Sequence, residues 1–261
     1  MRSSLLKYGV LLATLGATAA AAADESPHTL TANVGLYSQY VFRGLAQGNE
    51  KPAIQGGADY SHSSGFYAGT WLSNVSWFSD TNAGNSNSLE WDLYGGFRKS
   101  WDNGFSGDVG YLRYEYPGSY LALPAGTVKP NTDEAYVSIG WKWATLKYSY
   151  AFSNLFGVED SEGSDYLDLT VTVPLGEKFT IAAHAGSQSF KGASTAAVNA
   201  GTTNDALYSY EDYRATLGYA LGKGWTTSLT FTTTNAKDAG YTVLGKNIGD
   251  DQVVVGIART F

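Results

Sequence analysis

Three histidines and a set of Asp, Glu, Lys and Arg side chains are the groups in this chain that could do acid–base or metal chemistry. His184 is the strongest candidate, because a predicted hairpin register places it opposite Asp168. A general base and the carboxylate that orients it would have this arrangement. However, the sequence around His184 lacks the His-x-Ser-Asn run that twelve-stranded outer-membrane phospholipases use. His28 and His62 have no metal ligands at useful spacing. A satisfied charge pair is favoured over a catalytic base, so we expect no enzyme activity, no cofactor and no metal.

The composition excludes several other classes. With 24 acidic and 17 basic residues the formal net charge is −7, and no basic stripe is present to neutralise nucleic-acid phosphates. The absence of cysteine rules out a disulfide scaffold and thiol catalysis. The chain is rich in Gly, with 31, and in Tyr, with 19, which suits a wall with aromatics facing lipid and small or polar groups facing water.

The N-terminus has the pattern of a secretory signal. Arg2 and Lys7 form a positive region, the segment 8–15 is a short apolar core, and residues 21–23 are three alanines before Asp24. We therefore predict a cleaved signal peptide at 1–23 and one domain at 24–261. Beyond the signal no apolar run is long enough for a membrane-spanning helix, so a membrane role has to rest on alternation.

Alternating apolar and polar residues recur along the chain with a period of two, which predicts β-strands. The stretches are 30–43, 89–98, 167–173 and 216–221. Between the predicted strands, short turns alternate with long polar loops. This order is typical of an all-β, transmembrane, antiparallel up-and-down barrel of about twelve strands, with short periplasmic turns and long extracellular loops. The turns are 61–65, 102–104, 142–144, 174–178 and 222–224, and the loops are 44–51, 76–87, 117–131, 154–164, 191–209 and 235–249.

The turns also predict hairpin registers. Around 102–104, Arg98 falls opposite Asp108 on the polar face. Around 174–178, Val173 faces Phe179, which puts Asp168 opposite His184. Around 222–224, Leu221 faces Trp225 and Leu217 faces Leu229, whereas the hairpin at 142–144 is expected to contain a bulge.

Aromatic residues gather at both ends of the predicted strands, as in the two girdles of an outer-membrane barrel. Near the turns these are Tyr60, Phe66, Trp101, Phe105, Trp141, Phe179, Trp225 and Phe261; near the loops they are Tyr40, Phe42, Trp91, Tyr150, Phe152 and Phe231. The ending Val253, Val255, Ile257 and Phe261 resembles the terminal strand that barrel assembly machinery recognises. Arg259 stands where an aromatic or apolar residue is usual.

Three stretches resemble the TorF-like porin family of Gram-negative outer-membrane proteins: ANVGLYSQYVFRG at 32–44, PAIQGGADYSHSSGFYAGTWLSNV at 52–75 and LEWDLYGGF at 89–97. The ending VVVGIARTF is compatible with it. The resemblance implies a porin-type barrel in the outer membrane, and brings neither catalytic residues nor an established substrate.

These observations predict an outer-membrane channel for passive diffusion of small hydrophilic solutes or ions. The expected pore-lining residues are Arg43, Asp92, Arg98, Asp108, Lys147, Asp168, His184 and Arg214, with Asp59, Glu90 and Asp212 on the same polar face.

Other readings of the polar face and of the barrel remain open. The same charges could instead form a network that closes a narrow barrel. A non-conducting structural, adhesive or receptor barrel is one alternative function, and an outer-membrane hydrolase is another. The expected partners are outer-membrane lipid, lipopolysaccharide, the assembly machinery and the solutes. The loop 191–209 is a candidate constriction because it is long and rich in small residues.

Overall fold

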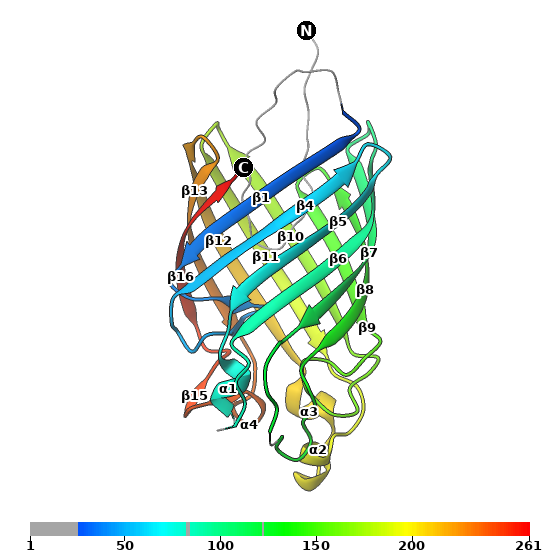
Figure 1. The fold of residues 1–261 in the computed structure, drawn as a ribbon, viewed down its shortest axis with the longest axis vertical. Coiled ribbons are helices and arrows are strands. Elements are labelled where there is room, and N and C mark those ends of the chain that lie inside the picture. The colour runs from blue at the N-terminus through cyan, green and yellow to red at the C-terminus, as the bar shows by residue number, and fades with distance from the viewer. Residues whose placement is uncertain (1–25, 82–83, 122) are drawn as a thin grey trace.

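The computed structural model describes residues 26–81, 84–121 and 123–261, so the predicted signal peptide at 1–23 and its cleavage before Asp24 lie outside the described residues. In the described chain, twelve strands form a closed antiparallel barrel (Figure 1), as the alternation predicts. They are β1 (His28–Tyr37), β4 (Ala53–His62), β5 (Phe66–Asn74), β6 (Leu89–Ser100), β7 (Phe105–Glu115), β8 (Thr132–Trp141), β9 (Ala144–Ala151), β10 (Asp165–Leu175), β11 (Phe179–Ser189), β12 (Tyr210–Gly222), β13 (Trp225–Thr234) and β16 (Gln252–Thr260).

The first and last strands close the ring. β1 pairs with β4 along its whole length and with β16 from Asn33 opposite Thr260 to Tyr37 opposite Gly256. Every barrel strand therefore has a hydrogen-bonded neighbour on both sides, which removes the open edges that a flat sheet would carry. No helix in the described ranges is long and apolar enough to cross a membrane.

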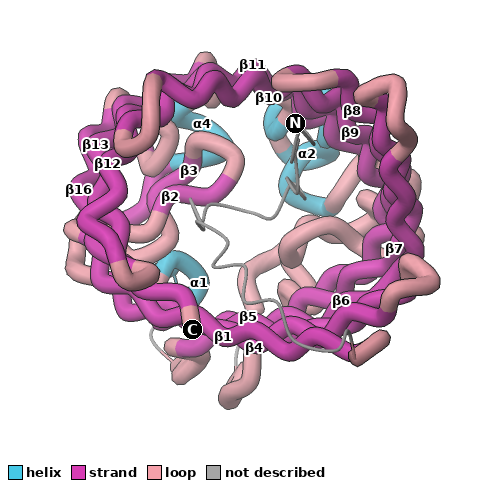
Figure 2. The backbone as a smooth tube through the Cα atoms, turned by 90° about the horizontal axis from the view of Figure 1, so that it is seen from above, coloured by secondary structure: helices cyan, strands magenta, loops and turns pink. Residues whose placement is uncertain are grey.

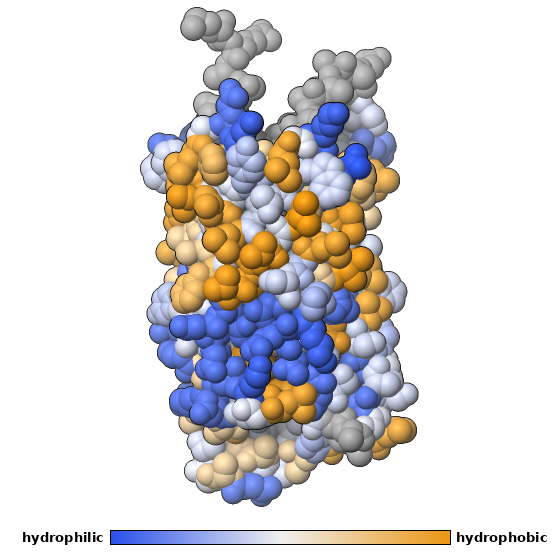
Figure 3. Space-filling view, turned by 90° about the vertical axis from the view of Figure 1, so that its left-hand side faces the viewer, coloured by the Kyte–Doolittle hydropathy of each residue, from blue (hydrophilic) through white to orange (hydrophobic). Residues whose placement is uncertain are grey.

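The outer face of the barrel is apolar. Leu93 and Leu217 are 38% and 43% exposed, and large apolar side chains alternate outward along every strand. Figure 3 shows how they gather in a band on one side of the wall, in the part nearer the turns, with polar side chains below it. An apolar band of this extent fits a hydrocarbon surround, because water makes such exposure costly.

The short turns lie at one end of the barrel together with the C-terminus, and the long loops lie at the other (Figure 1). The loops carry the small elements: the hairpin of β2 (Val41–Phe42) and β3 (Leu45–Ala46), the pair β14 (Thr242–Val243) and β15 (Lys246–Asn247), and the short helices α1 (Trp77–Thr81), α2 (Thr195–Asn199), α3 (Asn204–Tyr208) and α4 (Asp238–Tyr241). The predicted separation of short turns from long loops is thus observed.

Two of the predicted pairings hold. Arg98 lies opposite Asp108, and Leu217 lies opposite Leu229. Leu221 does not face Trp225, because a bulge between Ala220 and Gly222 leaves it out of the ladder.

The other two hairpins differ from the prediction. The bulge expected at 142–144 is absent, since Trp141 pairs directly with Ala144 across a two-residue turn. Around 174–178 the predicted register is wrong by two residues: Leu175 pairs with Phe179, and Val173 faces Ile181. Gly176 adopts a φ of 68°, which tightens the connection to three residues and lengthens both strands.

The girdle prediction is correct for most residues and wrong for two. Trp101, Trp141 and Trp225 near the turns are 40–49% exposed, and the loop-side aromatics Trp91, Tyr150, Phe152 and Phe231 are also exposed. Tyr40 and Phe42 are instead buried, with 8% and 9% exposure. They do not belong to the outer wall, because β1 ends at Tyr37 and the chain then turns into the barrel.

Candidate functional site

The inward face of the barrel is the candidate site, since its strands direct charged and hydrogen-bonding side chains into one enclosed volume. The acidic and basic strand residues on this face are Asp59, Glu90, Asp92, Arg98, Asp108, Glu134, Lys147, Asp168, His184, Asp212 and Arg214. They alternate with the outward apolar residues, so a single strand supplies both a lipid-facing and an inward surface.

Seven of the eight residues predicted to line the pore are strand residues on this inward face: Asp92, Arg98, Asp108, Lys147, Asp168, His184 and Arg214. The eighth, Arg43, reaches the interior by a different route from the one predicted. The alternation at 30–43 predicts a single strand, whereas Arg43 lies at the tip of the β2–β3 hairpin, which Figure 2 shows inside the ring of strands.

A tight turn at Arg43 and Gly44 builds this hairpin. Their φ values are 44° and 79°, as a two-residue hairpin loop with both residues left-handed requires. A Cβ on Gly44 would clash with Thr234 Cγ2 and lie 2.8 Å from Asp212 Cβ, so only glycine fits at this contact with β12 and β13.

The segment 38–52, which we call the inner hairpin, crosses the bore and touches several parts of the wall. Tyr40 donates a hydrogen bond to Glu90 of β6 at 3.0 Å, and the ring of Phe42 packs edge-on against Tyr114 of β7 at 5.7 Å. Arg43 bonds to β8 and β11. Because these contacts come from strands around the ring, the inner hairpin narrows the loop half of the barrel.

Arg43 is the most heavily bonded residue of the inner hairpin. Its guanidinium lies 2.8 Å from Glu134 Oε2 and donates a second 2.8 Å hydrogen bond to Gln188. It also stacks 4.2 Å from the ring centre of Tyr166. The side chains of Arg43 and Glu134 are only 7% and 3% exposed, so each charge depends on the other for its compensation.

A second network surrounds His184. Its Nε2 lies 2.9 Å from Asp212 Oδ1 and its Nδ1 lies 3.3 Å from Asp168 Oδ2. The predicted register, with Asp168 directly opposite His184, is wrong, since Thr170 pairs with His184 in the ladder and Asp168 pairs with Gly186. Asp168 and His184 still meet diagonally across the strands. The hydroxyl of Tyr166 donates to Asp212 at 2.7 Å, so the network joins β10, β11 and β12.

Tyrosines bind the carboxylates of the turn half. Tyr67 donates to Asp108 at 2.7 Å, and Tyr94 donates to Asp59 at 2.6 Å. The guanidinium carbon of Arg98 lies 4.1 Å from the ring centre of Tyr67, and Arg98 does not form an ion pair with Asp108. Similarly, Lys147 lies 4.0 Å from the ring of Tyr136, which hydrogen-bonds to Tyr67. Except for the buried Tyr67, these groups are half-buried, in contrast to the tightly packed loop half.

Glu134 is the main site residue that the sequence analysis missed. It belongs to the alternating stretch 132–141, in which Glu134, Tyr136 and Ser138 oppose Ala135, Val137 and Ile139, and that pattern was sufficient to find it.

The loop 191–209 was a candidate constriction, and it lies beyond the strand ends instead (Figure 1). Two contacts hold it against the loop 152–164: the Thr195 amide donates to Glu159 at 2.8 Å, and the Ala193 amide donates to Asp160 at 2.9 Å. The segment that enters the bore is the inner hairpin.

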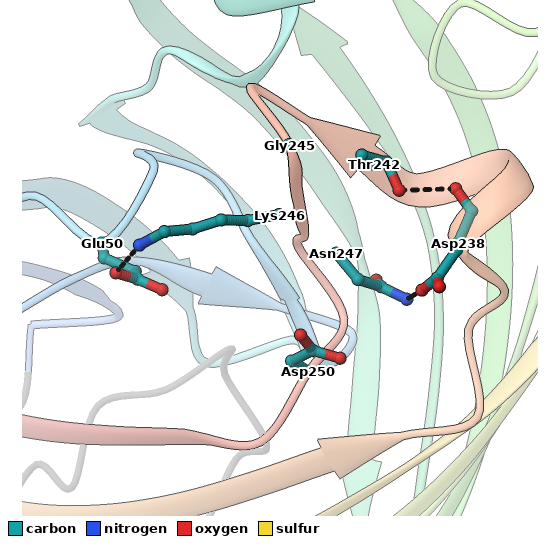
Figure 4. Close-up of a pocket in the computed structure, with 7 residues that line it drawn as sticks. All are labelled: Glu50, Asp238, Thr242, Gly245, Lys246, Asn247 and Asp250. Atoms are coloured by element: carbon teal, nitrogen blue, oxygen red, sulfur yellow. Dashed lines mark hydrogen bonds and ion pairs between the residues drawn. The ribbon is translucent and has the colours of Figure 1, made fainter.

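A polar pocket of about 450 Å³ opens between the inner hairpin and the loop 235–251 (Figure 4). Lys246 bonds to Glu50 at 2.6 Å on one side, and Asn247 bonds to Asp238 at 2.9 Å on the other. The pocket marks where the two loops are tied together at the loop end.

Comparison with known proteins assigns the family. A family described as a bacterial protein of unknown function (Gcw_chp) matches residues 20–261, and the chain belongs to it. No curated protein matches in sequence.

Solved structures share the fold. A KdgM porin is similar with a TM-score of 0.54 and 10% identity over 88% of this chain and 99% of that one. A NanC porin is similar with a TM-score of 0.52 and 14% identity, over 89% of this chain and 99% of that one. The COG4313 outer membrane channel from Pseudomonas putida F1 is similar with a TM-score of 0.50 and 12% identity, over 92% of this chain and 97% of that one. At such identities the likeness concerns the fold alone.

Proposed function

We propose that this chain is an outer-membrane porin-like channel for the passive diffusion of small hydrophilic solutes or ions. The observation that carries the proposal is the contrast between the two faces of one closed wall. Leu93 and Leu217 face outward, while Arg98, Asp108 and Lys147 are half-buried in the interior. A closed sheet with an apolar outside and a charged inside is what a water-filled bore through a bilayer requires.

Three structures with this fold are named as porins or as an outer membrane channel, which supports the same function here. The resemblance to TorF-like porins supports it as well. The proposal includes a cleaved signal at 1–23, turns in the periplasm, loops outside the cell and recognition by the assembly machinery. It assigns His184 a structural role and the protein no catalytic activity.

The inner hairpin is the proposed constriction of this channel. Arg43 and Tyr40 fasten it to the wall in the loop half, so a solute has to pass beside it or displace it. Bore width at this level then sets the largest solute that passes, as side chains filling a barrel limit its lumen.

Conductance of the purified protein in planar bilayers, with a series of solute sizes, tests the proposal. Stepwise currents with a size cut-off are expected, and the cut-off should rise in Arg43→Ala.

The burial of the inner hairpin favours one second candidate, a barrel that does not conduct and acts through its loops. If the wild type is silent and Arg43→Ala conducts, the protein is a channel closed by its inner hairpin. If both stay silent while folded, the channel proposal is wrong and the non-conducting barrel replaces it.

A further inference from the structure

Basic residues line the turn end of the barrel. Lys142 and Lys223 lie within two turns, Lys178 lies at the end of a third, and Lys99 lies beside a fourth; all four are exposed. Arg259 adds a fifth charge near the end of β16. We call these five residues the basic rim. The acids in the same connections are Asp102 and Glu177, so the rim has an excess of positive charge.

The basic rim borders the aromatic girdle. Lys142 Nζ lies 4.4 Å from the ring centre of Trp141, and Arg259 Cζ lies 4.4 Å from that of Phe261. Lys99 and Lys178 lie 6.0 Å from the rings of Trp101 and Tyr219. A cation beside an outward aromatic stands at the boundary between hydrocarbon and headgroups, with its stem in the apolar layer.

In the described part of the chain, the bases of the rim are not paired with the nearby acids. None of its five bases forms an ion pair there, and the Nε of Arg259 is buried without a hydrogen-bond partner. At the loop end, Lys246 and Arg113 lie 2.6 Å and 2.7 Å from carboxylates and Lys191 lies 3.7 Å from one, while Lys51, Lys129 and Lys237 form no ion pair within the described residues.

We propose that the basic rim binds the phosphate groups of anionic glycerophospholipids in the leaflet that meets the turns. Three features of the rim support this: its cations are unpaired, they lie beside a row of outward aromatics, and an apolar band lies directly beyond that row. A lipid headgroup matches all three, because its phosphate meets the cations while its acyl chains cover the band. This inference depends on the part of the proposed function that places the barrel in a membrane, and not on conduction.

The rim also accounts for Arg259. A basic residue is unusual at that position of a terminal barrel strand, and here its guanidinium lies between the rings of Trp225 and Phe261, at 5.6 Å and 4.4 Å. Held at this level, it adds a phosphate-binding charge where the first and last strands meet.

Lipid retention tests the proposal. The folded barrel is loaded with equal amounts of phosphatidylglycerol and phosphatidylcholine, and the lipids that remain bound are counted by native mass spectrometry. The test variant is Lys142→Gln/Lys178→Gln/Lys223→Gln. The matched control, Lys129→Gln/Lys191→Gln/Lys246→Gln, removes the same charge at the loop end. Heat-modifiable migration on a gel verifies that each variant is folded.

The wild type and the control should retain phosphatidylglycerol preferentially. In the test variant this preference should fall about fivefold or more. A single basic residue near an anionic surface contributes ~1 kcal/mol, which corresponds to about a fivefold change in binding. An unchanged preference, or an equal fall in the control, overturns the proposal. Displacement of the lipid by inorganic phosphate at matched ionic strength overturns it too, since it identifies a free-anion site. A barrel that keeps the preference but passes no current leaves this inference standing and removes the channel.

Discussion

Arg43 and Glu134 lie 2.8 Å apart inside the barrel although 91 residues separate them in the sequence. Arg43 lies at the tip of the inner hairpin, which is not part of the barrel wall, whereas Glu134 belongs to a strand of the wall. Their contact fixes the position of the inner hairpin across the bore. Because both side chains are almost fully buried, losing either leaves an uncompensated charge, at a cost of about 3–5 kcal/mol.

Arg43→Ala should therefore release the inner hairpin and increase single-channel conductance in planar bilayers. The penalty of the unpaired Glu134 falls on the docked state, and about 3 kcal/mol is enough to shift the docking equilibrium roughly a hundredfold. Arg113→Ala is the control, since this half-exposed arginine pairs with Asp133 on the outer face, where such pairs contribute about 1 kcal/mol or less. Equal conductance in wild type and Arg43→Ala would falsify the role of the hairpin as constriction.

Gly44→Ala should loosen the same hairpin without changing any charge. A left-handed φ of 79° strains alanine by about 1–2 kcal/mol, and the new Cβ meets Thr234 and Asp212 of the wall. Gly245→Ala is a close match, because its φ is 80° and nothing lies within 4 Å of the added carbon. Conductance should rise in Gly44→Ala and stay at the wild-type level in Gly245→Ala. If the two variants behave alike, backbone strain alone accounts for the effect and the close contact with the wall has no part in it.

The barrel could be predicted from the sequence because its signal is local. A strand between lipid and a polar bore alternates every second residue, and Leu93 next to Asp92 carries this information without any knowledge of the neighbouring strands. The Arg98 register followed in the same way, since Asp102–Gly104 is a turn of defined length.

The inner hairpin could not be predicted by the same reasoning. Residues 38–43 continue the alternation of β1, because a hairpin packed within the bore also has one apolar and one polar side. Alternation of apolar and polar residues shows that the two sides of a segment face different environments, but it does not show what those environments are. Only the pair Arg43 and Gly44, as a two-residue turn, distinguishes a hairpin from a continuing strand. The partner of Arg43 depends on a fold-wide contact, which a single sequence does not encode in its spacing.

His184→Ala should lower the stability of the barrel. Asp212 and Asp168 each lose one bond while keeping those from Tyr166 and Thr170. A hydrogen bond to a charged group contributes about 1.5–3 kcal/mol. A lower urea midpoint for unfolding from micelles is the expected result. His62→Ala, at the half-buried end of β4 beside a turn, should unfold as the wild type does. An unchanged midpoint would show that the two carboxylates find other partners, and loss of a lipid-hydrolysing activity in His184→Ala would instead support the hydrolase alternative.

The contact between the loops 152–164 and 190–209 should weaken in acid. Bonds from the amide and side chain of Thr195 hold the pKa of Glu159 below its usual range. A lowered pKa favours the ionised form in the folded state, so this stabilisation is present above the ordinary glutamate pKa of about 4.3 and is lost as the pH falls through the folded-state value. Protection of the Thr195 amide in hydrogen exchange should decrease over that window. Glu159→Gln should show low protection already at neutral pH, whereas Glu162→Gln in the same loop should retain the wild-type profile. Acid-independent protection in the wild type would mean that the two loops are held together by the Asn204 contacts to the Glu159 and Asp160 carbonyls, not by the ionised carboxylate.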